Sequence, residues 1–546
     1  IFHHNSFNSL DCTTPLYSKL FPDSKIACKM STARTKGTAI VKYILAPHTV
    51  DIFKSDLENT IFFSLATDAS NHKSEKIFPI IIQYFTKSDG IKSQLIKMSS
   101  LKNETSETIS QYCIDTLNNL KIPLKKCIAF CADNANTNFG GIHRKGQNNI
   151  FFKLKEAIQN ELEGVGCSAH ILHNTISTAA NTFSFDAEMI IFKIFGYFSI
   201  YTVRTEKLKD FCEFVDINYR TILNHSKTRW VSLLPAVERT LSMWPALKSF
   251  FQSEEKPPKI LLDTFNSPMS ETYMWFLHAQ LVIFNRNILL IEKSKTSIIE
   301  LRKILSTISD NLKNRQINKF VGLKVLEMLR KEEISDQVKH TFYEEVDEFY
   351  NTAITYLTKW SVSTNHFHVF DWMSLLEPIA WRDVEETIIY LSDKNIQLDD
   401  SLLFDQLTYL KKKIEEFKNS ILDWDNKIAS EKWQCFFSVS IHDEQHSELL
   451  KIAQYVFAIP AHNANVERVF SLMEIQWTDE RNRLQLDTVE SIIMCKYNYK
   501  KTCSEFYEYV KTQPSLLTSV KSSKKYEWYK ENETEEPSHP GPSTSK

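Results

Sequence analysis

The chain has 546 residues, enough for three or four compact domains, and its 42% hydrophobic and 24% charged content is that of a soluble globular protein rather than a disordered chain. Because 65 basic and 67 acidic side chains leave a net charge of −2, no global field attracts a nucleic acid or a membrane. Any site for a polyanion must therefore be a local patch. Only 10 glycines occur, which predicts that helices and large cores dominate.

Short apolar runs and helical periodicity predict an α/β sheet early in the chain, after a mostly helical segment at 1–59. Apolar runs bounded by polar or turn residues predict strands at 60–66, 77–85 and 127–131. Between the last two, apolar residues at helical spacing predict a helix over 104–120. An order of strand, strand, helix and strand indicates an α/β sheet.

The later part of the chain is expected to be all helical. Residues 269–459 contain one glycine and one proline, and their apolar positions repeat at steps of three and four. The charged run at 254–259, with two adjacent prolines, predicts a boundary before this part. No apolar stretch reaches the roughly 20 residues that a bilayer requires, so neither a transmembrane helix nor a membrane partner is expected. The polar residues after 532 predict a disordered tail.

Two similar sequence motifs each consist of an apolar predicted strand that ends in an aspartate. They are Ser-Leu-Ala-Thr-Asp68-Ala-Ser-Asn and Ala-Phe-Cys-Ala-Asp133-Asn-Ala-Asn. Aspartates at the carboxyl ends of neighbouring strands would converge at one rim of the sheet, where α/β proteins place ligand sites. Two carboxylates so close together favour a hard divalent cation such as Mg²⁺ or Mn²⁺. The alternative is that each aspartate caps the helix or turn that follows it.

A third carboxylate candidate, Glu467, lies at the start of a predicted helix. Pro460 and Asn463 are typical of a helix start, which places Glu467 in the first turn. The alternative role for this carboxylate is favourable pairing with the helix dipole. Spacing alone does not bring this helix to Asp68.

Further blocks have residue types that are suited to binding. Cys167 and His170 are zinc-ligand types, but no second Cys/His pair at finger spacing lies nearby, which favours a buried Cys/His pair. Arg229 and Trp230 suit phosphate contact and base stacking, and the alternative is a partly buried tryptophan at a helix start. The segment after Glu467 has a side rich in basic residues, which suits DNA binding. The alternative is that it is a solvated surface of mixed charge. Its candidate DNA contacts are Arg468, Arg481 and Arg483.

In their order, six blocks resemble the hAT superfamily of DNA transposases, and within it the branch that includes host-domesticated BED-finger proteins. The blocks are Ala-Thr-Asp68-Ala-Ser-Asn, Cys-Ala-Asp133-Asn-Ala-Asn-Thr-Asn-Phe-Gly, Gly-Val-Gly-Cys167-Ser-Ala-His170-Ile-Leu-His-Asn, Lys-Thr-Arg-Trp230, Asn-Val-Glu467-Arg-Val-Phe-Ser-Leu and Asp-Glu-Arg-Asn-Arg-Leu. The resemblance spans roughly residues 11–499, nearly the whole chain.

The resemblance implies an α/β plus all-α fold, in which a large all-helical insertion interrupts a ribonuclease-H-like catalytic domain. It implies that Asp68, Asp133 and Glu467 form a catalytic triad that holds two Mg²⁺ or Mn²⁺ ions, cleaves DNA with activated water and supports strand transfer. Trp230 would stack on an unpaired base near the cleavage point. Cys167 and His170 would be structural, because no zinc is expected in this chain.

The resemblance also implies a domain order and partners. The expected segments are a helical segment at 1–59, the first part of the ribonuclease-H-like domain at 60–250, the insertion at 251–440, the end of that domain with a helical dimerisation region at 441–510, and a tail at 511–546. A nuclear protein that binds DNA and forms a homo-oligomer through its C-terminal region is expected. No phosphate loop or dinucleotide glycine signature occurs, so no small-molecule cofactor is expected.

Two functions agree with these blocks. The first is an element-encoded transposase with metal-dependent DNA cleavage. The second is a domesticated nuclear protein that dimerises and binds DNA or chromatin without catalysis. An unrelated metal-dependent nuclease would share the triad but leaves the order of the six blocks unexplained. The family's N-terminal BED zinc finger does not occur in these residues, so we expect it to have been truncated or lost before Ile1.

Overall fold

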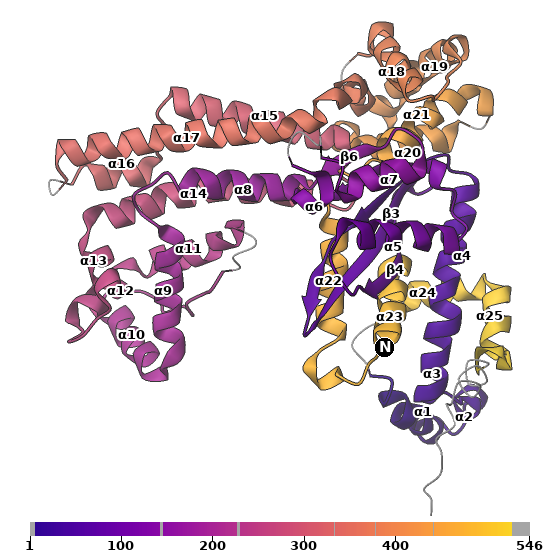
Figure 1. Ribbon diagram of the computed structural model, residues 1–546. Helices are drawn as coiled ribbons and strands as arrows, with labels where there is room; N and C mark the ends of the chain where they lie inside the picture. The colour runs from indigo at the N-terminus through magenta and orange to yellow at the C-terminus, as the bar shows by residue number, and fades with distance from the viewer. Residues whose placement is uncertain are drawn as a thin grey trace, which may run out of the picture.

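The computed structural model describes residues 6–141, 146–225, 230–331, 334–376, 378–440 and 442–526. It is mostly helical and contains one six-stranded mixed sheet, which agrees with the expected α/β plus all-α class. Figure 1 shows the sheet within a compact body, from which long helices project to one side.

The sheet has its central strand at β1. Its strands are β1 (Phe63–Thr67), β2 (Ser70–His72), β3 (Glu75–Thr86), β4 (Gly90–Ser100), β5 (Cys127–Ala132) and β6 (Glu163–Gly166). Strand β1 pairs antiparallel with β3 and parallel with β5. Strands β2 and β4 pair antiparallel with β3, and β6 pairs parallel with β5. The apolar runs predict β1, β3 and β5, whereas β2, β4 and β6 are additional.

Alternate side chains of each strand face two separate cores, because successive residues of a strand point to opposite faces. In β3, Ile80 and Ile82 belong to the core beneath α5 (Ser106–Asn119) and α7 (Ile150–Ile158). Ile81 belongs to the core on the opposite face. Helix α5 is the one that spacing predicts in this part of the chain.

The opposite face of the sheet is covered by helices from the far end of the sequence, α21 (Ser447–Ala458), α22 (Ala464–Gln476) and α23 (Leu486–Tyr499). Helix α21 packs on β1 and β3, α22 on β3, and α23 on β4. The N-terminal helix α4 (Ala46–Glu58) also packs against α23. The two ends of the chain thus close around one sheet.

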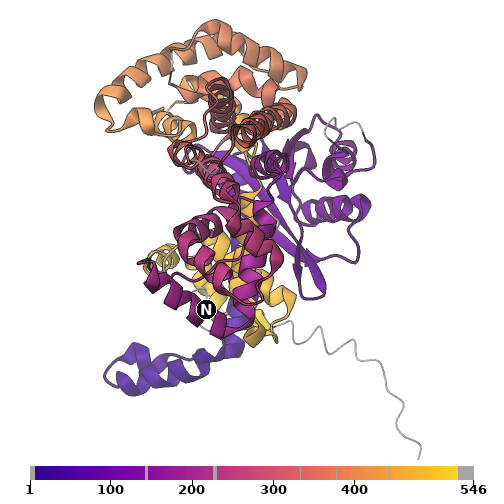
Figure 2. The same cartoon turned by 90° about the vertical axis from the view of Figure 1, so that its left-hand side faces the viewer.

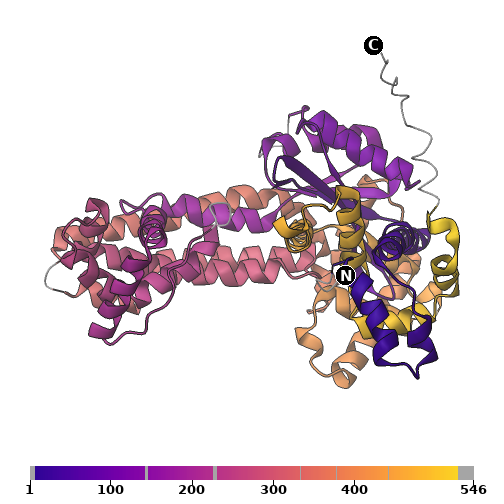
Figure 3. The same cartoon turned by 90° about the horizontal axis from the view of Figure 1, so that it is seen from below.

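Long helices lead away from the sheet and return to it. They are α8 (Ser168–Ala180), α14 (Pro268–Ile291), α15 (Ile298–Ile317) and α17 (Asp336–Asn365). Helix α8 begins directly after β6, and α17 packs along α8 and contacts β6. Figure 3 shows these helices extending from the sheet to a distal lobe. The lobe contains α9 (Ala187–Ile200), α10 (Thr202–Phe214), α11 (Leu233–Ser242), α12 (Trp244–Ser253) and α13 (Lys259–Asn266).

The remaining helices lie in several places: α16 (Leu323–Leu329) packs on α14 in the extension, α6 (Asn136–Phe139) packs on α7, and the others lie on the body. Figure 2 shows the N-terminal helices protruding from it as an arm. These helices are α1 (Ser9–Leu20), α2 (Lys25–Lys29) and α3 (Arg34–Ile40), and the others are α18 (Trp381–Asp393), α19 (Asp400–Ser420), α20 (Ala429–Val439), α24 (Cys503–Lys511) and α25 (Pro514–Lys521). The expected disordered end of the tail lies outside the described residues.

The predicted boundary at 254–259 falls between α12 and α13. These two helices pack against each other, and the rings of Phe251 and Phe265 stack with centroids 5.3 Å apart. The last strand, β6, ends much earlier, at Gly166. The division of the chain at residue 251 therefore stays a prediction.

Helix α14 is long and apolar enough to cross a membrane by length and composition alone. It is also a core helix, because it packs against α8, α11 and α15. Its buried Gln280 donates to the Tyr350 hydroxyl and accepts from Arg315, which are contacts within a protein interior.

Candidate active site

Asp68 and Asp133 follow the ends of two neighbouring parallel strands. In the register of β1 and β5, Ala66 lies beside Cys131, and each aspartate comes two residues later. Adjacent strands lie about 4.8 Å apart, so the two aspartates leave the sheet side by side at one edge. The fold therefore brings together the two carboxylates that the paired motifs predict.

Asp68 is half-buried and is held by two hydrogen bonds. Its Oδ1 accepts from the backbone N–H of Ala69 at 2.8 Å, and its Oδ2 accepts from Nδ2 of Asn463 at 3.1 Å. Burial, and then the negative charge of Asp133, raise the pKa of Asp68 to about 6. A carboxylate whose ionisation is opposed by burial and by a neighbouring negative charge favours a cation beside it.

Asp133 takes part in the turn that begins α6. Its Oδ1 accepts from the backbone N–H of Ala135 at 3.0 Å and from Nδ2 of Asn138 at 2.5 Å. The capping role that was the alternative for this aspartate is therefore present. It coexists with the position of Asp133 beside Asp68, because a carboxylate has several acceptor sites.

Glu467 is linked to the aspartates through the start of its helix. Asn463, the N-cap of α22, donates from Nδ2 to Asp68 and also to the carbonyl oxygen of Thr67 at 3.3 Å. Glu467 lies one turn further along α22 and is half-buried. Within the described ranges, however, no group of three His, Cys, Asp or Glu side chains is arranged to hold a metal ion. Asp68 and Asp133 thus lie side by side. Glu467 lies one helical turn beyond Asn463, the residue that donates a hydrogen bond to Asp68.

The donor atoms at this edge suit a hard divalent cation. Carboxylate and amide oxygens are ligands that Mg²⁺ and Mn²⁺ prefer. Besides the two carboxylates, the edge offers the Oδ1 atom of Asn463, which is buried without a hydrogen-bond partner. Asp68, Asp133 and Asn463 therefore fit such an ion, with Glu467 as the nearest additional carboxylate on α22.

The Cys167 and His170 block lies at the same edge, after the third parallel strand, β6. The Cys167 amide donates to the carbonyl oxygen of Ala132 at 2.8 Å, next to Asp133. A hydrogen bond with Cys167 raises the pKa of His170 to about 9 against the effect of burial, and the charges of Asp68 and Asp133 act in the same direction. His170 therefore lies within electrostatic reach of both aspartates.

This position of His170 was missed in the sequence, where the block suggests only a structural pair. Cys167 follows strand β6 just as Asp68 and Asp133 follow theirs, but the strand itself, Glu163–Gly166, carries no apolar run that would have revealed this position. Cys167 is completely buried, which agrees with a structural role for that side chain.

The segment of Trp230 lies beside α8. The Val231 amide donates to Nδ1 of His173, one turn after His170, at 3.3 Å. Arg229 lies outside the described residues, as does the side chain of Trp230, so their roles in DNA binding stay predictions. The backbone contact nevertheless brings this segment to the helix that carries His170.

The three candidate DNA-contacting arginines differ in their surroundings. Arg468 is half-buried and donates to the Glu292 carbonyl oxygen and to Asn465. Arg481 donates to Oε1 of Gln476 at 2.7 Å, whereas Arg483 is exposed. Arg468 thus stabilises the fold, and Arg483 is the most accessible of the three.

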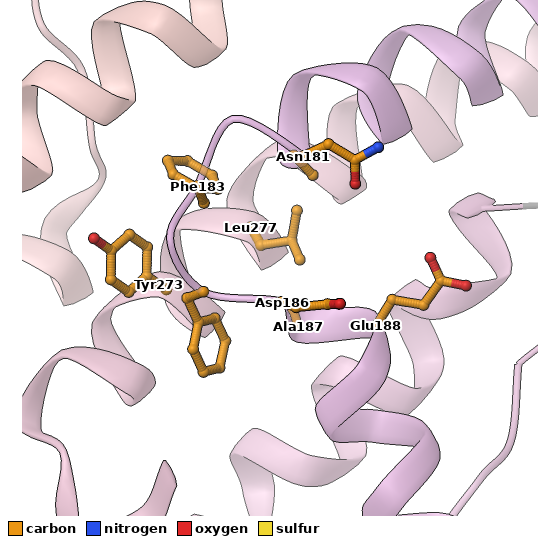
Figure 4. Close-up of a pocket in the computed structure, with 9 residues that line it drawn as sticks. Asn181, Phe183, Asp186, Ala187, Glu188, Tyr273 and Leu277 are labelled. Atoms are coloured by element: carbon orange, nitrogen blue, oxygen red, sulfur yellow. The ribbon is translucent and has the colours of Figure 1, made fainter. Parts of the chain in front are cut away.

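A separate cavity lies in the helical extension (Figure 4). It has a volume of about 160 Å³ and is lined by Phe183, Asp186, Glu188, Tyr273 and Leu277, among others. None of the candidate catalytic or DNA-contacting residues lines it. This cavity is therefore distinct from the carboxylate edge.

Comparison with known protein families finds one match, to the hAT family C-terminal dimerisation region, over residues 408–499. No curated protein matches the chain. The family match supports an hAT-family transposase or a protein derived from one, and it indicates homo-oligomer formation. The matched residues run from within α19 to the end of α23, so the region also supplies the helices that cover the sheet. Val469 and Ile492 are fully buried there and Phe470 is partly buried.

Proposed function

We propose that the chain is an hAT-like transposase, or a protein derived from one, that cleaves DNA with Mg²⁺ or Mn²⁺ held by Asp68, Asp133 and Glu467. The observation that carries this proposal is the pairing of Asp68 and Asp133 at one sheet edge, with Asn463 of α22 bonded to Asp68. The proposed enzyme acts in the nucleus as a homo-oligomer, for which the matched dimerisation region is the support.

The strand order supports a ribonuclease-H-like assignment of the sheet. Antiparallel strands β4, β3 and β1 are followed by parallel strands β5 and β6, with helices on both faces. The helical part between β6 and α21 then acts as the insertion, after which α22 returns to the carboxylate edge. This arrangement brings Asn463, at the start of the helix that carries Glu467, to Asp68, which lies 395 positions earlier in the chain.

In this proposal, the protein's own groups prepare the edge for a phosphodiester. When bound, divalent ions supply activation of water and stabilisation of the leaving oxygen. Asn463 fixes the orientation of the Asp68 carboxylate through its hydrogen bond. His170, whose pKa of about 9 keeps it positively charged at neutral pH, attracts the DNA phosphate to the edge. Arg229 and Trp230 bind the DNA strand near the cut.

The test is nicking of a duplex that carries the ends of the flanking element, with Mn²⁺ present. We expect Asp68→Asn, Asp133→Asn and Glu467→Gln each to abolish nicking while the protein remains folded. The matched control is Asp115→Asn, an exposed residue of α5, which should nick like the wild type. Full nicking by any of the three variants would remove that residue from the proposed triad.

A second candidate function is a catalytically silent nuclear protein that dimerises and binds DNA or chromatin. It is favoured by one observation, which is that Glu467 is not gathered with the aspartates into a three-ligand group in the described part of the chain. Duplex binding by a folded oligomer that never nicks, with or without Mn²⁺, would establish this function in place of the first.

A further inference from the structure

A second cavity, which several lysines line, lies along β4, away from the carboxylate edge. It has a volume of about 490 Å³ and is bounded by β4, the end of α23, the turn between α14 and α15, and α24. Figure 1 shows β4, α23 and α24 side by side in this part of the body. The lining residues that matter here are Lys92, Gln94, Lys295, Lys500, Lys501 and Tyr509.

The cavity gathers more cations than its carboxylates neutralise. Two of its lysines have acidic partners: Lys92 contacts Asp56 at 2.6 Å and Asp89 at 3.6 Å, and Lys295 contacts Glu431 at 3.5 Å. Lys500 and Lys501 form no ion pair in the described part of the chain. Their ammonium groups instead lie 4.9 Å and 5.3 Å from the ring centroids of Tyr497 and Tyr509.

The lysine at the centre of this group is held close to other cations. Lys500 is exposed at the surface, but partial desolvation of its ammonium group, and then the charges of Arg468 and Lys92, lower the pKa of Lys500 to about 8. Arg468 cannot turn away, because its guanidinium is fixed by Asn465 and by the carbonyl oxygen of Glu292. A bound anion would offset this mutual repulsion.

One buried side chain at the cavity carries a polar atom that has no hydrogen-bond partner in the described part of the chain. Gln94 lines the cavity with 6% of its surface exposed, and its Oε1 makes no hydrogen bond. Because this oxygen is an acceptor, it does not contact a phosphate oxygen directly, and the contacts to an anion come from the lysines.

The cavity is separate from the proposed catalytic edge. In the register of the sheet, Ser93 of β4 lies level with Gln83 of β3 and Ser64 of β1, whereas Asp68 follows the other end of β1. Four residues of strand correspond to about 13 Å. A ligand in the cavity would therefore bind beside, and not within, the carboxylate edge.

We propose that this cavity is a phosphate-binding site that holds the backbone of DNA through Lys500, Lys501, Lys92 and Lys295. The identification of the ligand as DNA rests on the proposed function. The chemistry of the site rests on the cavity itself, which concentrates lysines in a chain whose net charge is −2. Phosphate is the anion group that such lysine clusters bind through charge, and the DNA backbone supplies it without regard to sequence.

The test is the affinity for a labelled DNA duplex, measured by fluorescence anisotropy at several salt concentrations, with chelator present so that no cleavage occurs. We expect the double variant Lys500→Gln, Lys501→Gln to bind the duplex about tenfold more weakly. The slope of the logarithm of its affinity against the logarithm of the salt concentration should be shallower by about one to two units. The charge-retaining variant Lys500→Arg, Lys501→Arg should keep most of the affinity. The control is Lys411→Gln, Lys412→Gln, an adjacent exposed pair on α19, which should bind like the wild type.

Each outcome decides the proposal. Affinity and salt slope equal to those of the α19 control would overturn it. The alternative ligand is inorganic phosphate or a nucleoside triphosphate. If these stabilise the wild type in thermal unfolding while duplex affinity does not depend on the lysines, the assignment to DNA is overturned. Lysine-dependent duplex binding by a protein that never nicks would leave the cavity assigned and refute only the proposed catalysis.

Discussion

Asn463 donates a hydrogen bond to Asp68 across 395 positions of sequence, with Nδ2 and Oδ2 3.1 Å apart. Asn463 is the N-cap of α22, and Asp68 follows the central strand of the sheet. The bond therefore joins the two parts of the chain that the helical extension separates. It also orients one carboxylate of the aspartate pair from the helix that carries Glu467.

Asn463→Ala removes this orienting bond and leaves both aspartates in place. We expect Mn²⁺-dependent nicking to fall about 10-fold to 100-fold, because the Asp68 carboxylate is free to turn, while the free energy of unfolding falls by about 1 kcal/mol. Nicking rate and denaturant unfolding would be measured together. Ser471→Ala, at an exposed position of the same helix, is the control. Equal losses in both variants would contradict the orienting role.

The raised pKa of Asp68 predicts a stability that depends on pH and metal. Its pKa is about 6 in the folded protein and about 3.8 ordinarily, so the folded state holds more protons and stability falls as pH rises from about 4 to 6. At pH 7, the free energy of unfolding of Asp68→Asn should therefore be about 1–2 kcal/mol higher than that of the wild type. This figure is reduced for the partial exposure of the side chain.

Mn²⁺ should raise the midpoint of thermal unfolding of the wild type, because it offsets the same repulsion, and should not do so in Asp68→Asn. Thermal scans at pH 4.5 and pH 7, with and without Mn²⁺, check both statements. A less stable Asp68→Asn protein at pH 7, or an equal metal response in both proteins, would contradict them.

Gly166 leaves space for the loop that carries Asp133. A Cβ atom at Gly166 would lie 1.8 Å from Oδ1 of Asn134, the residue that follows Asp133. Gly166→Ala should therefore cost about 2 kcal/mol of stability or more and impair nicking. At Gly196, in α9, a Cβ atom meets nothing within 4 Å, so Gly196→Ala should stabilise the protein by up to about 1 kcal/mol. Equal stability of the two variants in denaturant titrations would refute the steric argument.

Glu163, at the start of β6, ties the sheet to the helical part. It contacts His366 at 3.1 Å and Lys394 at 2.7 Å, and it accepts from the Tyr390 hydroxyl at 2.8 Å. Burial opposes ionisation, but His366 and Lys394 lower the pKa of Glu163 to about 2. Glu163→Gln should cost about 2–4 kcal/mol, because it leaves Lys394 without its closest partner.

The lowered pKa of Glu163 also sets the pH range over which Glu163 stabilises the fold. The ordinary pKa is 4.5, so the stabilisation is complete above about 4.5 and is lost as pH falls towards 2. Glu163→Gln should therefore show a flatter acid-unfolding profile than the wild type. Glu156→Gln, at an exposed position of α7, should keep the wild-type profile. Identical profiles for Glu163→Gln and the wild type would contradict the account.

The sequence predicted those parts of the fold whose residues carry a local signal. The runs that became β1, β3 and β5 are mainly apolar because both faces of these strands are buried. Strand β4 was missed because Lys92, Ser93, Gln94 and Lys97 interrupt its apolar residues. Strand β6 has four residues, two of them glycine, and shows no run at all.

Of the candidate site, the sequence predicted only the part that the strand ends determine, which is the position of Asp68 and Asp133. The motifs that contain Asp68 and Asp133 indicated that both aspartates lie at one edge of the sheet, because the carboxyl ends of parallel strands lie at the same edge. The bond from Asn463 to Asp68 has no local signal, since it depends on how α22 docks after a long helical excursion. The lysines of the β4 cavity come from three distant segments, and a net charge of −2 conceals their grouping.

The central claim is that α22 brings Glu467 to work with the aspartate pair. The most direct measurement is single-turnover nicking of a labelled element-end duplex with Mn²⁺, comparing the wild type with Glu467→Gln and with Glu474→Gln, an exposed glutamate of the same helix. The account predicts nicking by the wild type and Glu474→Gln and none by Glu467→Gln, with equal duplex binding by all three. Undiminished nicking by Glu467→Gln would contradict it.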